Sequence, residues 1–219
     1  MRNPSIPYVL PFVVFLVFLS LDGKLGLRPE QEYPLRVFLL ATVLWVFSRK
    51  VIDLRVRNWG GTMGIGVLVF VLWIAPDQLI PGYRTHWLFQ NSLLGAAPAP
   101  SVGYAGVPLL ALVFRTIRAT AIVPIVEELF WRAWLMRWLI KPDFQSVALG
   151  TYVPQAFWIS AALFAAEHGP YWDVGLVAGV IYNWWMVRTK SLGDCILAHA
   201  VTNGVLSGYV LMTGQWQYW

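Results

Sequence analysis

Apolar runs long enough to cross a lipid bilayer recur along the chain, and they constrain its fold more than any other feature. A helix needs about 17–25 apolar residues to cross a hydrocarbon layer of about 30 Å. A lone strand would leave its backbone polar groups without partners in lipid. We predict about eight spans, near 6–21, 35–48, 62–76, 103–118, 119–138, 152–168, 174–188 and 194–213. The sequence therefore predicts an all-α, polytopic transmembrane helical bundle.

The composition supports this class and excludes two others. Of the 219 residues, 58% are hydrophobic and only 12% are charged, whereas soluble domains have about 25% charged residues. This excludes an ordinary soluble enzyme, and it also excludes a disordered chain, which would be poor in apolar residues. The net charge of +5 is typical of basic cytoplasmic loops, so we predict no nucleic-acid partner. The single cysteine, Cys195, excludes an internal disulfide.

The basic residues indicate an orientation. The segment 49–57 has four basic residues in nine, which favours a cytoplasmic loop and places the N-terminus inside. If 103–118 and 119–138 are separate spans, Arg188 and Lys190 lie outside. If 103–118 only re-enters the membrane, both lie inside, as the positive-inside rule prefers; span length favours the first interpretation. We expect a multi-pass integral protein of a bacterial cytoplasmic membrane, in contact with membrane lipid.

The first polar interruption of an apolar run is a pair of glutamates. A charge at mid-membrane costs roughly 2.5–3.5 kcal/mol, so it needs a partner or a function. Glu128 and Arg132 are four residues apart, share a helix face and can pair. Glu127 points about 100° away, and Pro124 predicts a kink just before both glutamates. An interfacial Glu–Arg pair that only orients the span is the alternative interpretation.

Two further interruptions contain the histidines of the apolar runs. His168 follows Glu167 and precedes Gly-Pro, a position typical of a capped helix end, where we interpret Glu167 as a solvated charge. His199 and Asn203 are four residues apart on one helix face. Each signal alone is also typical of hydrogen bonding between helices. Together these residues can converge on a water-holding cavity inside the bundle.

Other features predict helix packing rather than chemistry. The pairs Gly175/Gly179 and Gly204/Gly208 have the four-residue spacing that lets membrane helices approach closely. Asn183 lies in the predicted span 174–188, where its side chain can hydrogen-bond to another helix.

The three motifs resemble those of the CAAX prenyl protease and bacteriocin-processing (CPBP, Abi) family of intramembrane glutamate endopeptidases, which includes the Ras-converting CAAX protease. The patterns are Glu-Glu-x-x-x-Arg at Glu127, Glu128 and Arg132, Phe-x-x-x-His at Phe164 and His168, and His-x-x-x-Asn at His199 and Asn203. The resemblance covers about 120–205. It leads us to expect scaffold spans in 1–119, a catalytic core in 120–213 and a short tail in 214–219.

The resemblance implies a hydrolase without a nucleophilic side chain. In the family, the residues matching Glu127 and His168 activate a water, and those matching His199 and Asn203 donate hydrogen bonds to the oxyanion. Arg132 would hold Glu128. The predicted catalytic set is therefore Glu127, Glu128, Arg132, His168, His199 and Asn203, with no cofactor and no metal. We expect a membrane-associated peptide or protein substrate, lipidated or not, whose identity the sequence leaves open.

Two alternatives remain open from the sequence. The two histidines of the motifs and one or both glutamates could bind zinc, with a metal-bound water as the nucleophile. Ionisable groups in membrane spans also mark ion pathways. A non-catalytic transporter, immunity or binding protein is therefore the alternative from a different class.

Overall fold

The computed structural model describes residues 3–22, 24–91 and 106–219. Within these ranges the chain forms helices and turns and no β-strand, so the predicted all-α fold is confirmed. The helices before residue 92 are α1 (Ile6–Ser20), α2 (Pro29–Val43) with a π turn at Leu44–Ser48, and α3 (Trp59–Leu79). The later helices are α4 (Leu109–Ile117), α5 (Val123–Glu128), α6 (Met136–Trp138), α7 (Pro154–Ala166), α8 (Trp172–Thr189) and α9 (Leu192–Thr213).

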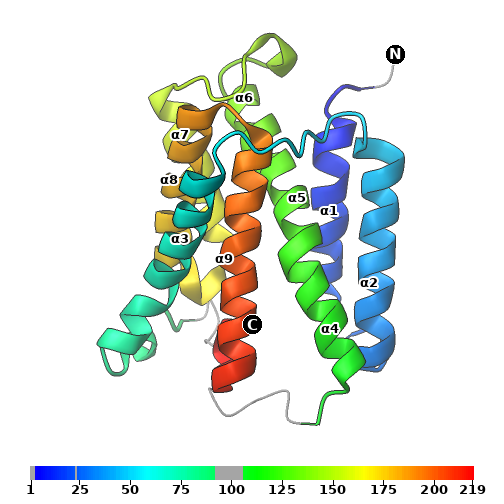
Figure 1. Ribbon diagram of the computed structural model, residues 1–219, viewed down its shortest axis with the longest axis vertical. Helices are drawn as coiled ribbons and strands as arrows, with labels where there is room; N and C mark the ends of the chain where they lie inside the picture. Colours follow the sequence, from blue (N-terminus) through cyan, green and yellow to red (C-terminus); the bar gives the residue numbers. More distant parts are fainter. Residues whose placement is uncertain (1–2, 23, 92–105) are drawn as a thin grey trace.

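The helices run up and down beside one another, with the two chain ends at opposite ends of the bundle (Figure 1). Among the described residues, three continuous helices are long and apolar enough to cross a membrane: Trp59–Leu79, Leu109–Trp138 and Leu192–Thr213. Large apolar side chains such as Phe38 (61% exposed) and Val46 (57% exposed) lie on the outside. An outer surface of this kind is expected where lipid replaces water, and the chain is an integral membrane protein.

In one detail the spans differ from the prediction. The expected separate spans 103–118 and 119–138 form one continuous helix over Leu109–Trp138, while residues 103–105 lie outside the described residues. The physical reason is that π turns at Arg118–Ile122 and Leu129–Leu135 carry the helix past Pro124 without a break. The distortion expected from Pro124 thus takes the form of wider turns rather than a chain reversal.

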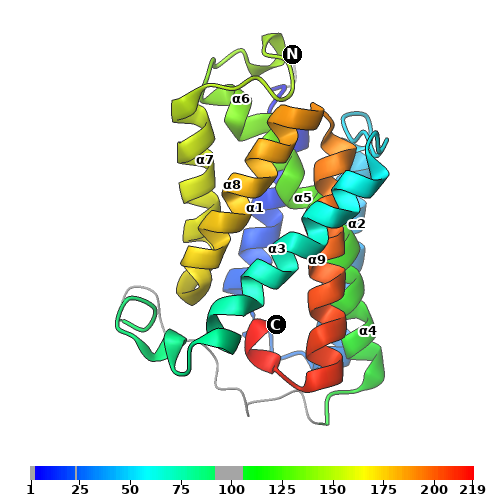
Figure 2. The ribbon, with the colours of Figure 1, turned by 60° about the vertical axis from the view of Figure 1, so that its left-hand side comes forward.

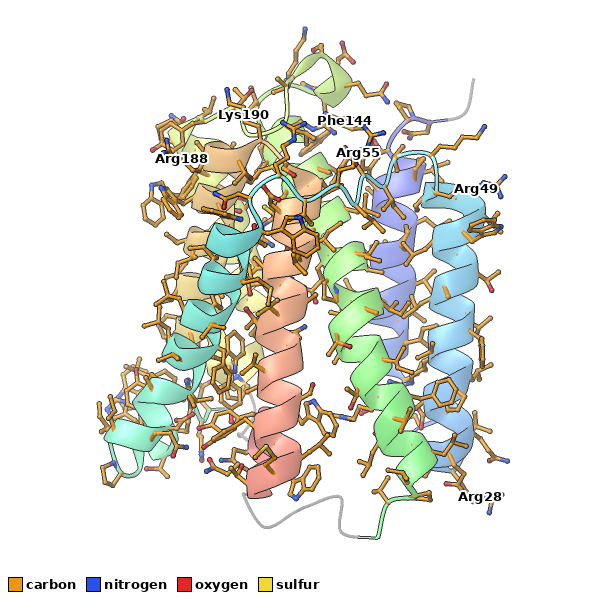
Figure 3. The ribbon with its side chains drawn as sticks, in the orientation of Figure 1. Arg28, Arg49, Arg55, Phe144, Arg188 and Lys190 are labelled. Atoms are coloured by element: carbon orange, nitrogen blue, oxygen red, sulfur yellow. The ribbon has the colours of Figure 1, made fainter. Side chains whose placement is uncertain are left out.

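This continuity bears on the two orientations that the sequence leaves open. Arg188 and Lys190 lie at the same end of the bundle as Arg49 and Arg55 (Figure 3). The loop before α3 is tied to the start of α9, because the backbone N–H of Arg57 donates to Asp194 Oδ1 at 2.7 Å. These four labelled basic residues therefore lie at one end of the bundle, the distribution that the positive-inside rule describes, while Arg28 lies at the opposite end (Figure 3).

Glycine residues allow α8 to pack closely on α7, and α3 to pack closely on α9. A Cβ added to Gly175 would lie 3.2 Å from the His168 ring, and one added to Gly179 would lie 3.1 Å from the carbonyl of Ala161, so this predicted pair does let α8 approach α7. The second pair does not fit the prediction. A Cβ on Gly208 would meet no described atom within 4 Å, because this face of α9 borders open space.

Gly66 is the small residue that α9 requires, and we expect Gly66→Ala to be strongly destabilising. Helix α3 crosses α9 obliquely (Figure 2), and a Cβ at Gly66 would lie 2.6 Å from both the Ala198 carbonyl and Val201. Overpacking of this kind costs about 1–3 kcal/mol. Thermal unfolding in detergent would measure the loss, with Gly64→Ala as the matched control, since its added Cβ meets nothing within 4 Å.

The short helix α7 ends before the full length of the bundle (Figure 2). Its 13 residues extend about 20 Å at 1.5 Å per residue, less than the hydrocarbon thickness. The turn Gly169–Tyr171 then reverses the chain into α8 (Figure 2). Arg84 fixes this turn, because its guanidinium donates to the Pro170 carbonyl at 2.8 Å and pairs with Asp77 and Asp173.

Candidate active site

A cavity of about 300 Å³ lies between the long helix Leu109–Trp138, the α7–α8 turn and α9. Four of the six predicted catalytic residues line it: Glu127, His168, His199 and Asn203. The other two, Glu128 and Arg132, are fully buried beside it and bonded to its wall. The structure therefore brings together the whole set that the motifs predicted.

Glu128 and Arg132 form the buried support of the site. Arg132 Nη1 donates to Glu128 Oε1 at 2.9 Å, and both side chains are 0% exposed, so the pair is not an interfacial one. Arg132 Nε donates to Asn183 Oδ1 at 3.1 Å, and its guanidinium stacks on the ring of Phe164. Asn183 in turn donates to the Phe157 carbonyl at 2.8 Å. This network connects three helices, as predicted for Asn183.

His199 lies between the two glutamates. Its Nδ1 is 2.9 Å from Glu128 Oε1, and its Nε2 is 3.9 Å from Glu127 Oε2. A carboxylate only accepts, so Nδ1 carries the hydrogen that it donates to Glu128. Nε2 then carries a hydrogen only in the imidazolium form. The ring stacks on Tyr182 at 5.2 Å between centroids, which fixes its plane.

His168 lines the cavity, and one of its two ring nitrogens is bound to the backbone. Its Nδ1 is 2.7 Å from the Phe164 carbonyl one turn earlier, so Nδ1 is the donor and Nε2 has the free lone pair in the neutral ring. Trp73 packs edge-on against the ring at 5.2 Å. The ring is thus held in one tautomer and one orientation, suitable for accepting a proton from a water.

The side chain of Asn203 binds a backbone carbonyl that Pro124 leaves without a donor. In the π turn, the Val123 N–H donates to the carbonyl of Arg118. Pro124 has no N–H to offer the next carbonyl, that of Ala119. Asn203 Nδ2 supplies the missing donor at 2.9 Å. One amide hydrogen of Asn203 is used in this way, and the second remains for a ligand in the cavity.

One prediction about the site is wrong, because Glu167 is not a solvated end charge. It accepts a hydrogen bond from Trp131 Nε1 at 3.3 Å, and its Oε2 is buried. Its neighbours therefore shield the Glu167 carboxyl, although it directly follows the last residue of α7.

The wall of the cavity also includes residues outside the motifs. Phe15, Val69 and Trp73 come from the front half of the chain, and Tyr218 and Trp219 come from its last residues. His86, by contrast, is exposed in a loop, as expected. No group of three or more His, Cys, Asp or Glu side chains in the described ranges is arranged to hold a metal ion.

Comparison with known proteins identifies one family. Residues 109–205 match the family model described as Type II CAAX prenyl endopeptidase Rce1-like. No curated protein and no solved structure matches the chain. The matched segment contains all three motifs and every predicted site residue. The resemblance predicted from the motifs is therefore confirmed, and the motif-bearing part of this membrane protein is similar to the Rce1-like type II CAAX prenyl endopeptidases.

Proposed function

We propose that this protein is an intramembrane endopeptidase in which Glu127 and His168 activate a water. The observation that carries the proposal is the shared cavity of Glu127, His168, His199 and Asn203, with Glu128 and Arg132 behind it. One carboxyl, two imidazoles and one amide thus line one space. The family match supports a membrane endopeptidase of the CAAX protease type.

In the proposed reaction, a water hydrogen-bonded to Glu127 and to His168 Nε2 attacks the peptide carbonyl. Glu127 takes the proton of the water while the new C–O bond forms. Asn203 Nδ2 and the Nε2–H of the His199 imidazolium donate to the oxyanion, each donor being worth about 2.7–4 kcal/mol in such sites. As the C–N bond breaks, the proton on Glu127 passes to the leaving amine.

The substrate class follows from where the site lies. The cavity is inside a bundle whose outer surface faces lipid, so a peptide must reach it from within or beside the membrane. We propose a membrane-associated protein or peptide as the substrate. Prenylated CAAX tails are the first candidates to test, because the matching family is described as CAAX prenyl endopeptidases.

Replacing His168 with alanine tests the proposal. We expect the purified protein in liposomes to cleave a membrane-anchored peptide, with prenylated and unprenylated CAAX peptides compared, and mass spectrometry to identify the new terminus. His168→Ala should lower the rate by about 10²–10⁴-fold, the usual contribution of a proton acceptor. His86→Ala, which changes an exposed histidine, should keep the full rate.

Two results would contradict the proposal. One is a normal rate of cleavage by His168→Ala, and the other is activity that disappears in chelator and returns with zinc. If the synthetic peptides are not cleaved, comparative proteomics of membranes containing the wild type or His168→Ala would search for a native peptide whose terminus changes.

A further inference from the structure

The cavity extends along two helices, and one of its ends is basic. Its lining residues on the long helix recur every three or four positions and so form one stripe: Arg115, Arg118, Ala119, Val123 and Glu127. The stripe on α9 consists of His199, Asn203 and Ser207. The two helices run in opposite directions and diverge toward the α4 end (Figure 1). Glu127 and His199 therefore lie toward one end of the cavity, and the two arginines lie toward the other.

Arg118 lines this basic end without an acidic partner in the described part of the chain. Its guanidinium lies over the ring of Tyr33, with 5.5 Å between Cζ and the ring centroid, and it forms no ion pair or side-chain hydrogen bond with any described residue. Asp22, the acid whose charge acts on it, is paired with Arg36 at 2.8 Å. A guanidinium stays ionised in proteins, and a charge inside a membrane span needs a counter-charge or a function.

Arg115 is the second cation of this end, and its neighbours hold it in place. Its Nη1 donates to the Tyr33 hydroxyl at 2.9 Å, and its guanidinium lies 5.1 Å from the ring of Trp219. The ring of Tyr33 thus contacts the guanidinium of Arg118 as well as that of Arg115. Two positive charges on one ring repel each other, and an anion in the cavity would relieve that repulsion. The basic end is therefore suited to bind an anionic group.

The separation between Arg118 and Glu127 indicates where that anion would be on a bound peptide. Glu127 comes nine residues after Arg118 in one helix, which is roughly 13 Å along the helix axis. An extended peptide advances about 3.3–3.6 Å per residue. A peptide whose scissile bond lies at Glu127 would therefore place a group roughly three to five residues away at Arg118.

A carboxylate is the anion that fits this position best. A peptide that enters from the membrane is mostly apolar, and a free carboxyl terminus supplies its negative charge. A guanidinium binds a carboxylate through two parallel hydrogen bonds. We propose that Arg118, with Arg115 beside it, binds the terminal carboxylate of the peptide substrate and so determines which bond lies at Glu127. This inference rests on the proposed function for the position of the scissile bond.

A binding measurement tests the inference without catalysis. The probe is a fluorescent prenylated CAAX peptide with a terminal carboxylate, compared with the same peptide as a carboxamide, and the protein is in phosphatidylcholine nanodiscs. We expect the wild type to bind the carboxylate roughly 10-fold to 100-fold more tightly, the usual effect of a charge-assisted pair of hydrogen bonds. Arg118→Gln should bind both peptides with the weaker affinity.

Arg28→Gln is the matched control for this variant. Arg28 is an exposed arginine at the α4 end of the bundle (Figure 3), so its substitution removes the same charge from that end without changing the cavity. It should keep the wild-type preference for the carboxylate. Arg118→Lys, which keeps the charge but not the planar guanidinium, should recover part of the affinity lost in Arg118→Gln.

Kinetics and the position of the cut distinguish this role from a structural one. We expect Arg118→Gln to raise KM for the carboxylate peptide roughly 10-fold to 100-fold, with kcat within about threefold and an unchanged melting temperature. When residues are added to the carboxyl terminus, the wild type should cut at the same distance from the new terminus. Arg118→Gln should lose this fixed distance and cut at several neighbouring bonds, as mass spectrometry would show.

Three results would overturn the inference. The first is a wild type that binds the two peptides equally or binds neither, and the second is a preference for the carboxylate that Arg118→Gln retains. The third concerns lipid phosphate as the source of the anion. We expect the preference to persist when phosphatidylglycerol replaces part of the phosphatidylcholine, and its disappearance would assign Arg118 to a lipid headgroup.

The outcomes separate this inference from the proposed function. A carboxylate preference that depends on Arg118, in a protein that cleaves neither peptide, would support the inference while the proposed function fails. Cleavage that depends on His168 but is equally efficient for the carboxylate and the carboxamide would support the proposed function and overturn the inference.

Discussion

Glutamine in place of Glu127 is expected to lower kcat by at least about 10³-fold, the largest effect on activity of any single substitution in the site. Glu127 is the only carboxyl that lines the cavity among the described residues. Its amide replacement cannot take the proton of a water. The general base and the proton donor to the leaving amine are therefore lost together. Cleavage of a membrane-anchored peptide, followed by mass spectrometry, measures the effect.

The same substitution should leave the fold intact or stabilise it. Glu127 Oε2 is buried without a donor, and replacing an uncompensated carboxyl with an amide removes an unfavourable group. We expect the melting temperature of Glu127→Gln to equal or exceed that of the wild type, which is the pattern of residues kept for activity. An inactive variant with a lower melting temperature would instead indicate a structural role, and a fully active one would refute the proposed mechanism.

Glu128→Gln is the matched comparison, because it makes the same chemical change one residue away. Glu128 accepts from both Arg132 and His199. Its loss should leave Arg132 without its carboxylate partner and His199 Nδ1 without its carboxylate acceptor. We therefore expect Glu128→Gln to lower both stability and kcat, in contrast to Glu127→Gln, which should lower kcat alone.

The local part of the site could be predicted from sequence because helix geometry alone determines it. The four-residue spacing of Glu128 and Arg132 predicted their pair, and the 100° rotation predicted that Glu127 points elsewhere; both are found. The all-α class followed in the same way from the apolar runs. Each of these predictions requires only residues within one turn or one span.

The parts that could not be predicted depend on contacts between distant segments. Asn183 and Glu167 meet Arg132 and Trp131 only because α7 and α8 pack against the long helix. The partner of Asn203 depends on a π turn, which a single sequence does not distinguish from an α turn. The same π turn joined two expected spans into one helix.

Alanine in place of Arg132 is expected to be the most destabilising single substitution. The arginine is buried, donates to Glu128 and Asn183, and stacks on Phe164. Its removal leaves the Glu128 carboxylate buried with only His199 as a partner, and breaking a buried ion pair in this way costs about 3–5 kcal/mol. Unfolding in detergent should show a loss of this size, together with a loss of cleavage.

Two controls connect that loss to the ion pair itself. Arg137 is a half-buried arginine of the same helix, and its Nη1 donates to the carbonyl of Val147 at 3.2 Å. Arg137→Ala should lower the free energy of unfolding much less than Arg132→Ala. In the double variant Glu128→Gln/Arg132→Met, no charge is left unpaired, so its stability should exceed that of Arg132→Ala. If Arg132→Ala is no less stable than Arg137→Ala, the pair does not stabilise the bundle. His199 would then be the partner that accounts for the stability of the buried Glu128 carboxylate.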